Sequence, residues 1–132
     1  MVRLTLCCAL VFCLAGAAQA FDEPTAKARV AEECVACAAY YDIIANCLEA
    51  TRPLDKDLAA RYRAIRQKLT QQAEELNGRP ETQAVDDAEA AMVREVHQDC
   101  NALAPLKDRY KEICKTLVEK PKSRLSHWLE QH

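Results

Sequence analysis

Residues 32–50 read EECVACAAYYDIIANCLEA and place three cysteines on one apolar segment. Apolar side chains recur there at alternating spacings of three and four residues, which is typical of a helix with one face in a core. Cys34, Cys37 and Cys47 therefore lie on one predicted helix. Their chemistry has three candidate forms: a redox centre, a metal site, or disulfides that join this helix to others.

The first twenty residues, MVRLTLCCALVFCLAGAAQA, predict a cleavable secretory signal peptide. One base, Arg3, precedes an apolar run from Leu4 to about Ala15, and the small-x-small motif AQA ends the segment at Ala20. The apolar run is shorter than the roughly 20 residues of a membrane-spanning helix. We therefore expect cleavage near Ala20 and no membrane span.

Cleavage would leave residues 21–132, enough for a single domain with one modest core. It removes one base and no acid, so the mature chain becomes more negative than the formal net charge of −2 of the full sequence. This balance provides no basic footprint for nucleic acid or for an anionic membrane surface. We expect a periplasmic or secreted protein that does not bind nucleic acid.

Proline placement predicts an all-α fold. Each proline precedes a segment of helix-forming residues, and proline is favoured at the first helical position because its missing N–H costs no hydrogen bond there. The five are Pro24, Pro53, Pro80, Pro105 and Pro121. Gly78, the only glycine after the signal segment, is placed to end the second helix. No alternating β-branched run predicts a strand.

Short connections between the first four helices predict an up-down-up-down four-helix bundle, followed by a short C-terminal helix that docks through Trp128. The third helix is expected to reach residue 103, and the charged segments RYRAIRQK (61–68) and VDDAEA (85–90) are expected on solvated faces. The expected core stripes are Val30, Cys34, Cys37, Tyr41, Ile44 and Leu48; Leu58, Tyr62, Ile65, Leu69, Ala73 and Leu76; Val85, Ala88, Met92, Val96, Cys100 and Leu103; and Leu106, Tyr110, Ile113 and Leu117.

Depth along this bundle predicts the disulfides among the five cysteines that follow the signal segment. Cys47 and Cys100 each lie about one turn from the same end. Cys37 lies about 15 Å below Cys47, and Cys114 lies about 13 Å below that end, where the fourth helix starts. We expect Cys47–Cys100 and Cys37–Cys114 bridges. Cys34 lies one turn beyond Cys37. Its Cα would therefore lie too far from that of Cys114 for a disulfide, which needs Cα atoms within about 7 Å. Bridges from Cys114 to Cys34 or to Cys100 are the alternatives.

Thiol chemistry at Cys34 and Cys37 is the main alternative to a disulfide scaffold. A redox dithiol needs a thiol at a helix N-terminus, whereas Cys34 lies inside the predicted helix directly after two glutamates. Attachment of c-type haem needs a histidine where Ala38 stands. Cys34 and Cys37 do share one helical face and could hold a soft ion such as Cu(I).

The segment ECVACAAYYDIIANCLE, residues 33–49, resembles the first helix of small exported bacterial proteins that carry a Cys-Ala-x-Tyr/Phe-Tyr segment. The resemblance is confined to these residues. It implies no activity and no functional residue.

The sequence contains no G-x-S-x-G, Gly-rich phosphate loop or H-E-x-x-H motif. We therefore expect a non-enzymatic binding or interaction module without a cofactor, whose partner is an envelope protein or a small ligand. The alternative is a thiol-based metal-binding or redox-handling protein that uses Cys34 and Cys37. If Cys34 is unpaired, it is either a buried small hydrophobe or the bridge of a covalent homodimer.

Overall fold

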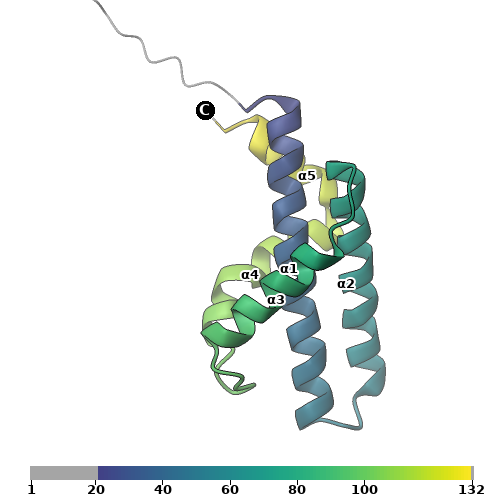
Figure 1. The fold of residues 1–132 in the computed structure, drawn as a ribbon, viewed down its shortest axis with the longest axis vertical. Coiled ribbons are helices and arrows are strands. Elements are labelled where there is room, and N and C mark those ends of the chain that lie inside the picture. Colours follow the sequence, from purple (N-terminus) through teal and green to yellow (C-terminus); the bar gives the residue numbers. More distant parts are fainter. Residues whose placement is uncertain (1–20, 132) are drawn as a thin grey trace, which may run out of the picture.

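The computed structural model describes residues 21–131, and this range is all-helical without a strand, as predicted. Five helices follow one another (Figure 1): α1 (Glu23–Thr51), α2 (Lys56–Asn77), α3 (Thr82–Glu95), α4 (Ala104–Glu119) and α5 (Pro121–Leu129). None of these helices combines the length and the apolar character that a membrane crossing requires. The predicted signal peptide, residues 1–20, lies outside the described residues.

Helix ends follow the local sequence signals. The Asp22 side chain caps α1 by accepting a hydrogen bond of 2.9 Å from the backbone N–H of Thr25. Proline occupies the first turn of α1, α4 and α5. Gly78 follows α2 with a φ of 67°, and its N–H donates to the carbonyl of Glu74. A Cβ at Gly78 would meet nothing within 4 Å, so this left-handed φ is what favours glycine there.

Helix α1 is the centre of the molecule. Its 29 residues span about 43 Å, and it contacts all four other helices. Residues outside the predicted stripe are also buried, among them Ala31, Ala38, Tyr40 and Ile43. The predicted stripe was too narrow because a helix surrounded by neighbours buries several faces. The small alanines on those faces allow the neighbouring helices to approach closely.

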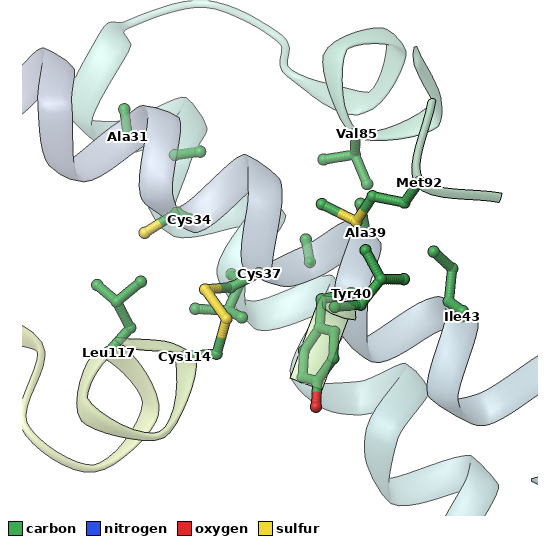
Figure 2. Packing of buried hydrophobic residues seen from close by; sticks show 14 of the residues in the cluster. Ala31, Cys34, Cys37, Ala39, Tyr40, Ile43, Val85, Met92, Cys114 and Leu117 are labelled. Atoms are coloured by element: carbon green, nitrogen blue, oxygen red, sulfur yellow. A yellow bond between two sulfur atoms is a disulfide. The ribbon is translucent and has the colours of Figure 1, made fainter. Parts of the chain in front are cut away.

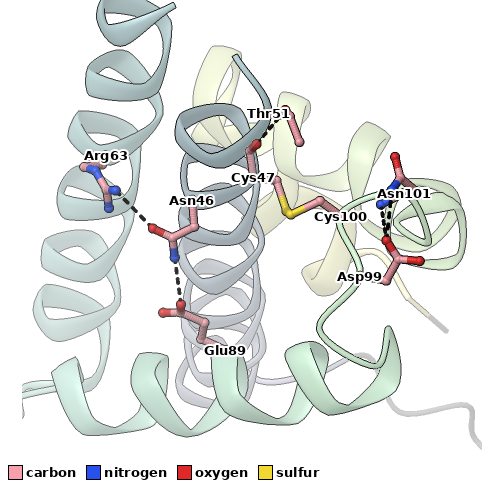
Figure 3. Close-up of a disulfide and its surroundings, with 8 residues drawn as sticks. All are labelled: Asn46, Cys47, Thr51, Arg63, Glu89, Asp99, Cys100 and Asn101. Atoms are coloured by element: carbon pink, nitrogen blue, oxygen red, sulfur yellow. Dashed lines mark hydrogen bonds between the residues drawn. A yellow bond between two sulfur atoms is a disulfide. The ribbon is translucent and has the colours of Figure 1, made fainter. Parts of the chain in front are cut away.

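The up-down-up-down four-helix topology is not confirmed. Helices α1 and α2 run antiparallel as a hairpin, whereas α3 lies across α1, as both Figure 1 and Figure 3 show. Helices α3, α4 and α5 each contact α1. The arrangement is thus a set of helices packed around α1.

Helix α3 ends earlier than the apolar pattern predicted. The expected stripe ran to Cys100 and Leu103, but the helix ends at Glu95, and both residues lie in the following loop. Leu103 is nevertheless 5% exposed. The apolar pattern therefore identified a buried residue but assigned it to the wrong kind of structure.

A Schellman motif terminates α3. The N–H of His97 donates to the carbonyl of Arg94, and the N–H of Gln98 donates to that of Val93. His97 and Gln98 have φ values of 52° and 59°. Glycine usually occupies the left-handed position of this motif. Histidine in its place left no sequence signal for the helix end.

Candidate functional site

Two disulfides attach α4 and the loop before it to α1. Cys37 is bonded to Cys114 of α4, with a Cα–Cα distance of 5.3 Å (Figure 2). Cys47 is bonded to Cys100, with a Cα–Cα distance of 5.4 Å (Figure 3). These are the pairs that helix depth predicted. For Cys100 the geometry differs from that argument, because a loop, and not a helix parallel to α1, brings it to Cys47.

Cys34 is the one cysteine among the described residues that lies outside a disulfide, and its exposed fraction is 0%. Burial, followed by the neighbouring charge of Glu33, raises the pKa of its thiol to about 12. A thiol with this pKa is protonated at neutral pH, so it is a weak nucleophile and a weak metal ligand. It packs as a small apolar side chain in the core shown in Figure 2.

The structure does not bring Cys34 and Cys37 together as a pair of thiolates, because the sulfur of Cys37 is bonded to Cys114. Within residues 21–131, no group of three or more histidine, cysteine, aspartate or glutamate side chains could hold a metal ion. Any soft ion would therefore have only one thiol of this pair as a ligand.

A groove of about 710 Å³ lies between α1, α2, α4 and the loop before α4. We call it the tyrosine groove. Its lining includes three tyrosines, three lysines and the Cys47–Cys100 disulfide, with aliphatic side chains between them. The tyrosines are Tyr40, Tyr41 and Tyr62, and the lysines are Lys107, Lys111 and Lys115.

The tyrosines form a continuous aromatic wall. Tyr41 stacks on Tyr62 with ring centroids 5.6 Å apart and an interplanar angle of 18°. The ring centroids of Tyr40 and Tyr41 lie 5.4 Å apart. Figure 2 shows the hydroxyl of Tyr40 pointing away from the buried cluster. Burial raises the pKa of Tyr41 to about 12 and also raises the pKa of Tyr40. These hydroxyls therefore remain protonated and can donate hydrogen bonds.

The lysines form a second wall on α4. Lys107, Lys111 and Lys115 are spaced by four residues, which places them on one helical face. Within residues 21–131, none of the three ammonium groups forms an ion pair. On α4 the side chain that does so is Arg109, which binds Glu95 at 2.8 Å. This spacing was present in the sequence but was not recognised there as a signal.

A second cavity, of about 660 Å³, lies between α1, α2 and α5. It is also lined by three lysines, Lys27, Lys68 and Lys122, but its described lining holds no aromatic side chain. Lys27 is already paired with Glu23 at 2.6 Å. This cavity therefore has fewer unpaired charges and a weaker apolar surface than the tyrosine groove.

Charged side chains predicted to be solvated form a network where α2 and α3 meet α1. Arg63 donates to Asp42 at 3.2 Å. It also donates to Asn46 at 3.0 Å, and Asn46 donates to Glu89 at 3.2 Å (Figure 3). Arg66 binds both Asp42 and Asp86. Asp86 and much of Arg63 remain exposed, as the solvated-face prediction expects, but the crossing of α3 over α1 brings these charged groups into contact, which that prediction did not include.

The chain matches no protein-family model, and neither curated proteins nor solved structures show a match. The candidate site must therefore be interpreted from its own chemistry. Tyr41, Ile44 and Tyr62 were predicted as core residues, and the structure places them, half-buried, in the lining of the groove.

Proposed function

We propose that the mature chain is an exported, non-enzymatic binding protein that holds a small ligand with an apolar body in the tyrosine groove. The observation that carries this proposal is the groove itself. Its volume of about 710 Å³ falls within the range of roughly 300–1,000 Å³ that is usual for ligand sites. Aromatic and aliphatic walls with a few polar groups are also typical of such sites.

The disulfides support this proposal because they hold the walls of the groove in place. Cys47–Cys100 lies in the lining and ties the loop before α4 to α1. Cys37–Cys114 ties α4 itself to α1. Walls that are already ordered lose less conformational entropy when a ligand binds, which favours affinity.

The lining also favours binding over catalysis. Tyr40 and Tyr41 have raised pKa values, so they stay protonated and cannot serve as bases near neutral pH. The charged groups of the described lining are three lysines and one carboxylate, Glu119.

Export is supported by the signal-like segment and by two disulfides, which persist in oxidising compartments. In a Gram-negative source the compartment would be the periplasm. Cleavage after Ala20 would make Phe21 the first residue, and the Phe21 ring packs edge-on against Trp128 with centroids 5.7 Å apart. We expect the mass of protein purified from its source to correspond to a chain that starts at Phe21. A mass that includes residues 1–20 would contradict export by cleavage.

Binding of Nile red, a neutral dye whose emission increases in apolar surroundings, tests the groove. We expect the mature protein to bind the dye and the groove-filling variant Ile44→Trp to lose most of this binding. Leu76→Trp is the matched control, because Leu76 is also half-buried but lines the second cavity. Thermal unfolding of both variants verifies that they fold. Equal dye binding by Ile44→Trp and the parent protein would refute the groove as the site.

A further inference from the structure

The lysine wall determines the charge that a ligand of the tyrosine groove should carry. Lys107 and Lys115 are eight residues apart on α4, so the three lysines extend over about 12 Å of the groove. Among the described lining residues, Glu119 supplies the one carboxylate. The lining is therefore cationic, although the whole chain has a formal net charge of −2.

The two walls of the groove differ in chemistry. Helices α1 and α2 contribute tyrosine rings and aliphatic side chains such as Ile44 and Ile65, whereas α4 contributes the ammonium groups. The phenol hydroxyls and the ammonium groups are hydrogen-bond donors, and an ammonium group cannot accept. A ligand that satisfies this surface must supply acceptors on one side and apolar surface on the other.

We propose that the ligand is an organic anion whose apolar body lies against Tyr41 and Tyr62 and whose acidic head group pairs with Lys107, Lys111 and Lys115. This inference rests on the proposed function, since it names the class of ligand for the same groove. Carboxylates and sulfonates fit the donors, because charge-assisted hydrogen bonds are the stronger ones. Aromatic bodies can add stacking on the tyrosine wall.

The second cavity is the internal comparison. It has the same number of lysines and one acidic lining residue, Glu75, but Lys27 is already paired with the carboxylate of Glu23. Without an aromatic side chain in its described lining, it offers less apolar contact. An organic anion should therefore prefer the tyrosine groove.

Isothermal titration calorimetry on the mature, disulfide-bonded protein tests the inference. The probes are octanoate and 2-naphthoate, each compared with its neutral alcohol, 1-octanol and 2-naphthalenemethanol. We expect at least one anion to bind about tenfold more tightly than its alcohol, as a charge-assisted hydrogen bond predicts. The affinities for octanoate and 2-naphthoate then show whether the groove prefers an alkyl or an aromatic body.

Two triple variants with the same change in charge locate the head group. Lys107→Gln/Lys111→Gln/Lys115→Gln should weaken binding of the anion about tenfold and leave binding of the alcohol unchanged. Lys27→Gln/Lys68→Gln/Lys122→Gln, in the second cavity, should affect neither. Added salt should weaken binding of the anion but not of the alcohol, because the lysines are exposed and salt screens exposed charges.

The outcomes separate this inference from the proposed function. If anion and alcohol bind equally and Ile44→Trp abolishes both, the groove is a binding site but the inference is overturned. If only the second-cavity triple variant loses the anion, the inference is likewise overturned. If neither the four probes nor Nile red binds, the proposed function itself fails.

Discussion

The indole N–H of Trp128 donates a hydrogen bond of 3.1 Å to the carboxylate of Glu33, 95 residues earlier in the chain. Arg124, one turn before Trp128, donates to the same carboxylate at 2.9 Å through Nε. Trp128 and Leu125 also pack against the core. A helix of nine residues, as α5 is, is unstable alone in water, so these contacts with α1 are what order it. The predicted docking of Trp128 is confirmed.

Replacement of Glu33 by alanine should release α5. The variant loses the acceptor for both Trp128 and Arg124, and bonds to a partly buried charged group contribute about 1–3 kcal/mol each. We expect the tryptophan emission of the native protein to shift to the red and its free energy of unfolding to fall by about 2 kcal/mol. The measurement is intrinsic fluorescence during urea unfolding.

Glu49→Ala is the matched control, because Glu49 is exposed on the same helix and binds Arg63 of α2. It should leave the emission maximum unchanged. Identical spectra for the two variants would show that the bond between Glu33 and Trp128 does not hold α5.

Thiol counting tests the cysteine assignment and the metal or redox alternative together. In denatured but unreduced mature protein we expect one free thiol, Cys34, since the other four cysteines are in disulfides. In native protein this thiol should not react with a disulfide reagent at pH 8, because it is buried and its pKa is raised to about 12. Three or more free thiols would contradict the scaffold and support thiol-based metal or redox chemistry.

Non-reducing electrophoresis extends this test to oligomeric state. Since Cys34 is 0% exposed, we expect no dimer band that disappears in Cys34→Ser. A band lost in that variant would show instead that the thiol can reach a second copy of the chain.

Stability should decrease as the pH rises from about 4.5 to about 7. Burial, and then the neighbouring Asp42 carboxyl, raises the pKa of Glu89 from its ordinary 4.5 to about 7. In this window the folded protein retains a proton that the unfolded chain has lost, so each increase in pH favours unfolding. Glu89→Gln, which resembles the protonated form, should flatten this dependence and be more stable than the parent protein at pH 8.

Urea unfolding at several pH values measures this effect. Asp87→Asn provides the control, since Asp87 is exposed on the same helix and binds only Gln83 within the described residues. It should retain the pH dependence of the parent protein. A steep dependence that persists in Glu89→Gln would assign the effect to another group.

The left-handed backbone at His97 offers a stabilising substitution. Its φ of 52° is unfavourable for a residue with a side chain, by roughly 1–2 kcal/mol. His97→Gly relieves this cost but adds freedom to the unfolded chain, so we expect a net gain of about 0.5–1 kcal/mol in the free energy of unfolding. Ala91→Gly, at an exposed helical position of α3, should instead cost about 1 kcal/mol. Loss of stability in both variants would contradict the Schellman motif at this position.

The sequence by itself determined the helices and several of their ends. Caps and helix propensities act within a few residues, so the Asp22 cap and the Gly78 end are local properties of the chain. Both predicted disulfide pairs are present, although the prediction assumed a four-helix bundle that the structure does not confirm. Cys100 reaches Cys47 from a loop, and not from the helix that the apolar pattern predicted.

Only the tertiary structure decided how the helices cross and which charges meet. The angle of α3 over α1 depends on the shapes of both packed surfaces, which no periodicity in one segment reports. This crossing turns Glu89 from an apparent surface acid into a partner of Asn46. In the same way, Tyr62 and Lys111 lie 49 positions apart in the chain and line one groove because α1 holds both α2 and α4. Long-range contacts of this kind arise only when separate helices pack on a common core.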